Sequence, residues 1–147
     1  MKPFVFNLEK VLGLRKYREE ETKIELGKAI GVLSDLEGRI RIIGRERVRA
    51  AEAQFSPENS ASQIQQYMFY LLRLDNTKEE LLKEAALAEL KVEEAREVFL
   101  EASRERKVLD KLKEKRQKEY RKQMFAEETR ILDDISGSAP ARLGVMA

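Results

Sequence analysis

Apolar side chains recur at alternating steps of four and three residues along two long stretches of this chain. The first stretch carries the repeat at Leu8, Leu12, Arg15, Glu19, Thr22, Leu26, Ala29, Leu33, Leu36, Ile40, Ile43, Arg47 and Ala50. The second carries it at Tyr67, Leu71, Leu74, Lys78, Leu81, Ala85, Ala88, Val92, Ala95, Phe99, Ala102, Arg106 and Leu109. Steps of four and three keep side chains on one face of an α-helix. The pattern therefore predicts two long helices, each with one apolar seam.

The segment between the two seams cannot continue a helix. Pro57 would remove a backbone hydrogen bond from a helix interior, and Ser60 with Gln63 has the spacing of a capping box that opens a new helix. So short a connection makes the two helices antiparallel neighbours. We therefore predict an all-α fold, a long antiparallel two-helix coiled coil (a helical hairpin).

The predicted hairpin forms a single domain over residues 1–135. Helix one is expected at about 6–53, the turn at about 54–61 and helix two at about 62–135. The run from Ser136 to Pro140 ends the helical pattern, so 136–147 is expected to be a flexible tail. Folding about the turn pairs Leu8 with about residue 108, which leaves about 25 residues of helix two, nearly 40 Å, without a partner in the chain.

Composition argues against an enzyme. Of the 147 residues, 38% are charged and 7% aromatic, and the chain has no Cys and no His. Disulfides, thiolate nucleophiles, imidazole bases and the usual zinc ligands are therefore excluded, and we expect no cofactor and no metal. The 29 Lys and Arg nearly balance the 27 Asp and Glu. No stretch approaches the roughly 18 apolar residues of a membrane span, so the cytoplasm is the expected compartment.

Glycine is common in helix one, at Gly13, Gly27, Gly31, Gly38 and Gly44. Each glycine costs a helix interior about 1 kcal/mol relative to Ala. Helix one is therefore expected to be weak alone and to need its partner helix.

A basic stretch lies between Arg104 and Lys122. It holds ten basic residues and four acidic ones. Three interpretations are open: a solvated helix face, a nucleic-acid-binding arm, and a contact with an acidic protein surface. We favour the protein contact, because Tyr120 is the only aromatic residue interleaved with the basic ones and base stacking needs more.

An apolar run from Tyr67 to Leu72 is wider than one seam requires. Tyr67 and Leu74 can face helix one, whereas Phe69 and Leu72 point elsewhere at about 100° per residue. The run is either local packing at the hairpin tip or a docking patch for a partner.

The chain resembles the FliJ family, the small coiled-coil component of the bacterial flagellar type III export apparatus. The resemblance covers about residues 4 to 134. It is carried by Phe4-x-Phe6-x-Leu8-x-x-Val11-Leu12-x-x-Arg15, Glu19 to Glu21, Tyr67 to Leu74, and Leu109-x-x-Leu112-Lys113-Glu114-Lys115 followed by Tyr120. Members of this family are similar to the stalk of a rotary ATPase. The five glycines of helix one make it less stiff than a stalk that transmits torque, which weakens the expectation of torque transmission more than the expectation of binding.

The resemblance implies a stalk-like protein of bacterial flagellum biogenesis and motility, similar to the gamma subunit of rotary ATPases. Implied partners are the hexameric flagellar export ATPase, the cytoplasmic domain of the export-gate membrane protein, and export chaperones. It implies association with the cytoplasmic face of the inner membrane through these partners only. The expected gate contact at the hairpin tip comprises Tyr67, Phe69, Tyr70, Leu72 and Leu74. The expected ATPase contact comprises Lys113, Lys115, Arg116, Lys118 and Tyr120.

Two other functions remain open. One is a structural coiled-coil spacer or scaffold that dimerises through the unpaired end of helix two. The other is the basic nucleic-acid-binding arm.

Overall fold

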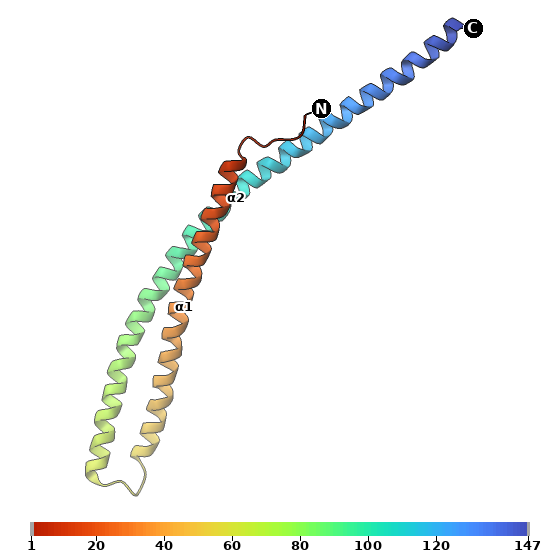
Figure 1. The fold of residues 1–147 in the computed structure, drawn as a ribbon. Coiled ribbons are helices and arrows are strands. Elements are labelled where there is room, and N and C mark those ends of the chain that lie inside the picture. The colour runs from red at the N-terminus through yellow and green to blue at the C-terminus, as the bar shows by residue number, and fades with distance from the viewer. Residues whose placement is uncertain (1, 147) are drawn as a thin grey trace. The chain divides into compact units, whose positions relative to one another are not determined.

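A computed structural model describes the backbone of residues 2–146 and the side chains of residues 2–137. Two helices make up the fold, α1 at Glu9–Gln54 and α2 at Ala61–Met146 (Figure 1). The described part of the chain contains no strand. The predicted all-α helical hairpin is confirmed.

The chain divides into two compact units. One, the hairpin unit, spans Arg18–Ala102 and contains the turn. The other, the strap unit, combines the first 17 residues with the part of α2 from Ser103 onward. Each is described by itself.

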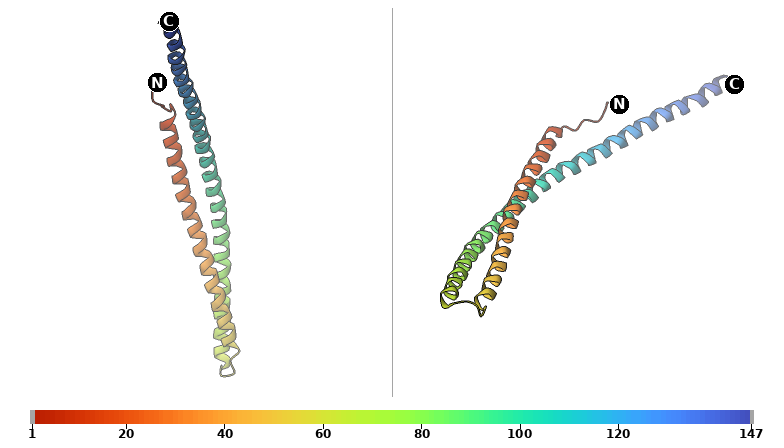
Figure 2. Two further views of the ribbon diagram at one scale, coloured as in Figure 1. Left: turned by 90° about the vertical axis from the view of Figure 1, so that its right-hand side faces the viewer. Right: turned by 60° about the horizontal axis from the view of Figure 1, so that its bottom comes forward.

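In the hairpin unit α1 and α2 run side by side in opposite directions, as both views of Figure 2 show. Leu36, Ala85 and Ala88 form a buried cluster, and the partly buried residues packed against it are Leu33, Ile40 and Leu81. These are positions of the two predicted seams. The alanines leave room for the helices to approach closely, so the seam is closed by small side chains.

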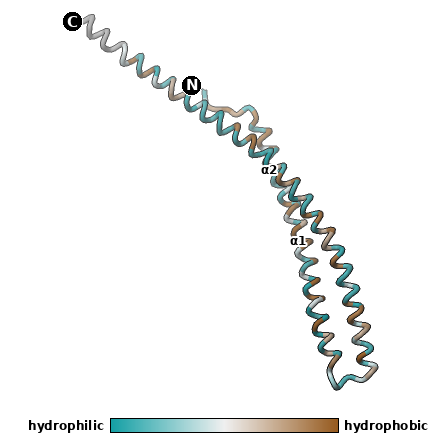
Figure 3. The backbone as a smooth tube through the Cα atoms, turned by 180° about the vertical axis from the view of Figure 1, so that it is seen from behind, coloured by the Kyte–Doolittle hydropathy of each residue, from teal (hydrophilic) through white to brown (hydrophobic). Residues whose placement is uncertain are grey.

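Apolar positions are spaced along otherwise hydrophilic helices (Figure 3). Every predicted seam position except Arg47 is buried or half-buried, and polar members such as Glu19, Thr22 and Lys78 are half-buried too. Periodicity alone therefore identified which face of each helix is covered.

The turn is held by local hydrogen bonds. The side-chain amide of Asn59 donates to the carbonyls of Ala53 at 2.6 Å and Gln54 at 3.2 Å, two acceptors in the last turn of α1, and the N–H of Ser56 also donates to Ala53 at 3.2 Å. The backbone N–H of Ser60 donates to Oε1 of Gln63 at 2.8 Å, and the N–H of Gln63 donates to Oγ of Ser60 at 3.2 Å. This reciprocal pair is the predicted capping box.

α1 begins at Glu9 and not near residue 6, where we expected it. Residues 2–8, which we call the N-terminal strap, are not helical. In a helix, Phe4 and Phe6 would lie about 200° apart and could not both face α2. Outside a helix both side chains reach α2, where Phe6 is buried.

α2 continues to Met146, so the helix end predicted near Ile135 is wrong. The hydroxyl of Ser136 donates to the carbonyl of Leu132 at 2.7 Å, a bond that serines make inside helices. Gly137 does not adopt the positive φ that would mark a helix end. Side chains beyond Gly137 lie outside the described residues, and the flexibility expected for 136–147 stays a prediction.

The glycines of α1 are not required by packing. A Cβ atom built on Gly13, Gly27, Gly31, Gly38 or Gly44 meets nothing within 4 Å, and none of them has a positive φ. Alanine would therefore fit at each position without a clash or a strained backbone.

Candidate functional site

The hairpin tip carries an exposed apolar surface on α2. Phe69 is 61% exposed and Leu72 57%, and Met68 is similarly exposed. We call these three residues the tip patch, and all three lie on the side of α2 away from the seam. Leu74, which the sequence grouped with them, is only 7% exposed. Leu74 is therefore part of the seam and cannot touch a partner while the hairpin is closed.

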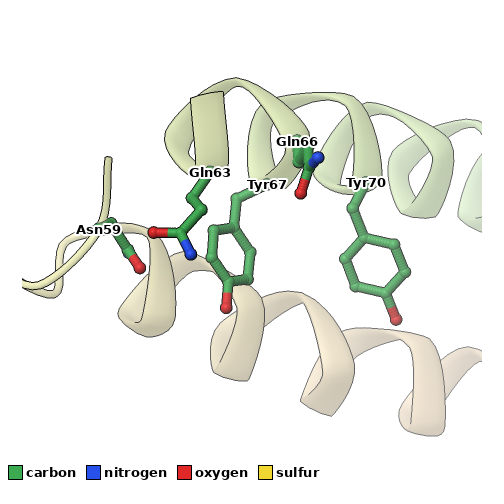
Figure 4. A pocket seen from close by; sticks show the side chains of 5 residues that line it. All are labelled: Asn59, Gln63, Gln66, Tyr67 and Tyr70. Carbon is green, nitrogen blue, oxygen red and sulfur yellow. The ribbon is translucent and has the colours of Figure 1, made fainter. Parts of the chain in front are cut away.

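Beside the tip patch, Tyr67 and Tyr70 point from α2 toward α1 (Figure 4). With Asn59, Gln63 and Gln66 they line an open pocket of about 340 Å³. Tyr67 is half-buried and Tyr70 lies at the edge of exposure. The two tyrosines thus belong to the hairpin closure as much as to its surface.

An ion pair links the two helices farther along the hairpin unit. Nε of Arg47 lies 2.6 Å from Oδ1 of Asp75. The hydrogen bond from Arg47 lowers the pKa of the Asp75 carboxyl below its usual value, and Asp75 raises the pKa of Arg47 in turn. Both side chains are nearly half exposed, so this is a screened surface pair.

In the strap unit, the aromatic residues of the N-terminal strap pack on α2. The rings of Phe4 and Tyr120 have centroids 5.6 Å apart and are tilted by 53°. The Tyr120 hydroxyl donates to the backbone carbonyl of Lys2 at 2.5 Å. The guanidinium of Arg116 lies 5.7 Å from the centre of the Phe6 ring, a cation–π distance. Phe6 is 5% exposed, so it anchors the strap.

The first turns of α1 add charged contacts to the same unit. Nζ of Lys113 lies 2.8 Å from Oε2 of Glu9, and Arg15 forms an ion pair with Glu105. Leu12, at 1% exposure, is the most fully buried large side chain. Together these contacts join the start of α1 to a part of α2 that is far away in the sequence.

These contacts change the expected ATPase site. Lys113, Arg116 and Tyr120 each contact the N-terminal strap or the start of α1, whereas Lys115 and Lys118 are exposed. The expectation that helix two lacks a partner over this range is therefore wrong for residues 113–120. The prediction paired only helix with helix, so it did not include the non-helical strap that contacts these residues.

Beyond Tyr120 every described side chain of α2 is exposed, from Arg121 to Gly137. Large apolar side chains recur there on one side of the helix, at Met124, Phe125, Ile131, Leu132 and Ile135. At about 100° per residue they fall within an arc of about 120°. We call this set the terminal apolar stripe.

Sequence reasoning missed the role of the strap. The available signal was the spacing of Phe4 and Phe6, two residues apart and directly before the first heptad position. Such spacing puts both rings on one side of an extended segment but not of a helix.

No helix among the described residues is long and apolar enough to cross a membrane. Within the same residues, no group of three or more Asp or Glu is arranged to hold a metal ion.

A helical hairpin with exposed apolar side chains at its tip and along the end of one helix belongs to the class of coiled-coil interaction proteins. The family model described as flagellar FliJ protein matches residues 4–144, nearly the whole chain. The chain therefore belongs to the FliJ family, a non-catalytic component of the flagellar protein export apparatus. Neither the curated proteins nor the solved structures include a match.

Proposed function

We propose that this protein is a stalk-like component that promotes assembly and activity of the hexameric export ATPase and links it to the cytoplasmic domain of the export-gate protein. It also receives empty export chaperones. It works at the cytoplasmic face of the inner membrane, held there by its partners.

The terminal apolar stripe is the observation that carries the proposal. A helix exposed on all sides gains little stability from five large apolar side chains, and such surfaces mark interaction sites. The neighbouring basic stretch would steer this helix toward an acidic channel. A partner that binds the assembled ring better than its subunits shifts assembly by mass action, so the stalk needs no catalytic group of its own.

The proposal is tested by measuring how much the protein increases the rate of ATP hydrolysis by the purified export ATPase. Phe125→Ala with Leu132→Ala removes two of the five side chains of the terminal apolar stripe without touching the contacts of the N-terminal strap. We expect this variant to lose most of the stimulation while keeping wild-type helicity. Leu87→Ala with Leu90→Ala is the matched control, because both leucines are exposed on α2 within the hairpin unit. Full stimulation by the Phe125→Ala, Leu132→Ala variant contradicts the proposal.

The gate contact is assigned to the tip patch, together with the edges of Tyr67 and Tyr70. Phe69→Ala with Leu72→Ala should weaken binding to the gate's cytoplasmic domain and leave helicity unchanged, because exposed side chains contribute little to folding. The leucine control pair again keeps the number of deleted apolar groups equal. If the tip variant binds the gate domain as tightly as the wild type, the patch has no docking role.

The terminal apolar stripe also fits the alternative of a spacer that dimerises through this helix. Sedimentation equilibrium distinguishes the two. A dimer that the Phe125→Ala, Leu132→Ala variant disrupts, with no effect of the protein on the ATPase, favours the scaffold.

A further inference from the structure

Five exposed lysines follow one face of α2 within the strap unit, at Lys107, Lys111, Lys115, Lys118 and Lys122. We call this set the lysine stripe. Its steps of four, four, three and four residues place all five within an arc of about 80° and along about 22 Å of helix. Among the described residues, none of the five forms an ion pair.

The lysine stripe lies on the side of α2 opposite the N-terminal strap. At about 100° per residue, Lys113, Arg116 and Tyr120 centre about 170° away from the stripe. Lys113 pairs with Glu9 at the start of α1, and Arg116 and Tyr120 contact Phe6 and Phe4 of the strap. Closing the strap therefore leaves the stripe uncovered.

The carboxylates of this region do not neutralise the stripe. Glu105 pairs with Arg15, and Asp110 pairs with Arg106 at 2.7 Å. Glu114 and Glu119 lie outside the arc of the stripe, one on each flank, by about 20 to 40°. The positive charge of the basic stretch is thus concentrated on the outward face.

We infer that the lysine stripe is the surface that meets an acidic protein partner, and that Lys113, Arg116 and Tyr120 position the strap instead of touching that partner. The partner presents carboxylates in a line of about 22 Å, matching the length of the stripe. This inference rests on the proposed function in taking the partner to be the inner surface of the export ATPase ring. It replaces three of the five residues assigned to that contact from sequence.

A protein fits the stripe better than a nucleic acid does. Binding to single strands combines a basic groove with aromatic side chains on which bases stack. Between Lys107 and Lys122 the one aromatic side chain is Tyr120, which lies on the opposite face against Phe4. The stripe therefore offers charge without a stacking surface.

The experiment compares three variants of the full chain. The stripe variant carries Lys111→Gln, Lys115→Gln, Lys118→Gln and Lys122→Gln. A control with the same change in net charge carries Lys16→Gln, Lys23→Gln, Lys83→Gln and Lys91→Gln, all exposed lysines elsewhere. The strap variant carries Lys113→Gln and Tyr120→Phe. Glutamine keeps helix propensity close to that of lysine, so each variant should fold.

Affinity for the ATPase is measured at two salt concentrations. The stripe variant should bind at least about tenfold more weakly at 0.1 M salt and less than about twofold more weakly at 1 M, where the Debye length falls to about 3 Å. The charge control and the strap variant should bind within about twofold of the wild type. Hydrogen exchange of residues 4–9 should rise in the strap variant alone.

Several results would overturn the inference. If the wild type binds and stimulates the ATPase and the stripe variant binds it equally well, the lysine stripe is not the contact surface, but the proposed function stands. Equal losses in the strap variant and the stripe variant also reject the inference. If the wild type does not bind the ATPase, the proposed function fails, and the lysine stripe is then tested with polyglutamate as the probe.

In that test the stripe variant should bind polyglutamate more weakly than the wild type does, and equal binding rejects the inference. If the wild type binds a single-stranded oligonucleotide more tightly than polyglutamate at 0.15 M salt, a protein partner is rejected.

Discussion

In the hairpin unit, α1 and α2 contact each other through small and medium apolar side chains repeated along both helices, such as Leu36, Ala85 and Ala88. In the strap unit, α2 is contacted instead by a few large or charged groups, chiefly Phe6, Leu12 and Glu9. Burial is shared among many positions in the first unit and concentrated in a few in the second. Substitutions should therefore act cooperatively in the hairpin unit and locally in the strap unit.

The sharpest test of this difference is a charge in the hairpin seam. Ala88→Asp places an unpaired carboxylate against Leu36 and should destabilise the hairpin by more than about 3 kcal/mol. Thermal unfolding followed by circular dichroism measures the effect. Leu87→Asp is the control, since Leu87 is exposed one residue away and its replacement should cost less than about 1 kcal/mol. Similar losses from both would mean that the seam is not the source of stability.

The strap unit is tested next by removing its anchor. Phe6→Ala should cost about 3 kcal/mol, near the lower limit for a buried Phe, and should release the strap. Amide exchange of residues 4–9 should rise, while the hairpin unit keeps its protection. Val5→Ala is the control because Val5 is exposed. Loss of protection throughout the hairpin would show that the two units unfold together.

How much of the fold could be predicted from sequence differs between the same two units. The seams were visible because period and burial coincide, so Leu36 and Ala85 could be assigned from spacing alone. The pairing of Phe4 with Tyr120 could not be assigned, because it depends on the non-helical path of the strap, whereas the seams were traced on helices alone. The helix past Ser136 was missed because that residue bonds to the backbone within the helix instead of ending it.

The candidate sites divide in the same way. Exposure of Phe69 and Leu72 followed from their helical angle, and so did burial of Leu74 once the seam was drawn. The basic stretch was found by counting charges, but a count does not separate its two faces. Lys113 belongs to one face and Lys115 to the other, which became evident only with Glu9 in place beside Lys113.

A smaller and opposite effect is expected from the glycines of α1. Gly27→Ala, Gly31→Ala and Gly38→Ala should each stabilise the hairpin by up to about 1 kcal/mol, because no atom obstructs the added methyl group. Melting temperatures of single and triple variants measure the gain. If the triple variant is more stable yet stimulates the ATPase less, the glycines provide flexibility that the proposed stalk role needs. A decrease in stability at any of the three positions would contradict the packing described above.

The smallest effect should come from acidifying the hairpin. Because pairing with Arg47 lowers the pKa of Asp75 in the folded state, the stabilisation is present above the unfolded pKa, near 3.9, and is lost as pH falls through the folded value. Melting temperatures at pH 2 to 6 should therefore converge for the wild type and Asp75→Asn at the acidic end and separate slightly above it. The pair is exposed, so 1 M salt should reduce this separation.

The sequence distance across the strap contacts has a consequence for the order in which the chain folds. Bonds at the turn join residues five or six apart, whereas Tyr120 and Lys2 are separated by 118 positions. Short loops close at the lowest entropic cost, so the hairpin should zip from the turn and the strap should dock last. During synthesis at about 5–20 residues per second, Phe4 and Phe6 would emerge roughly 6–24 s before their docking surface is complete. For that interval the nascent chain presents an aromatic segment that chaperones or other nascent chains can bind.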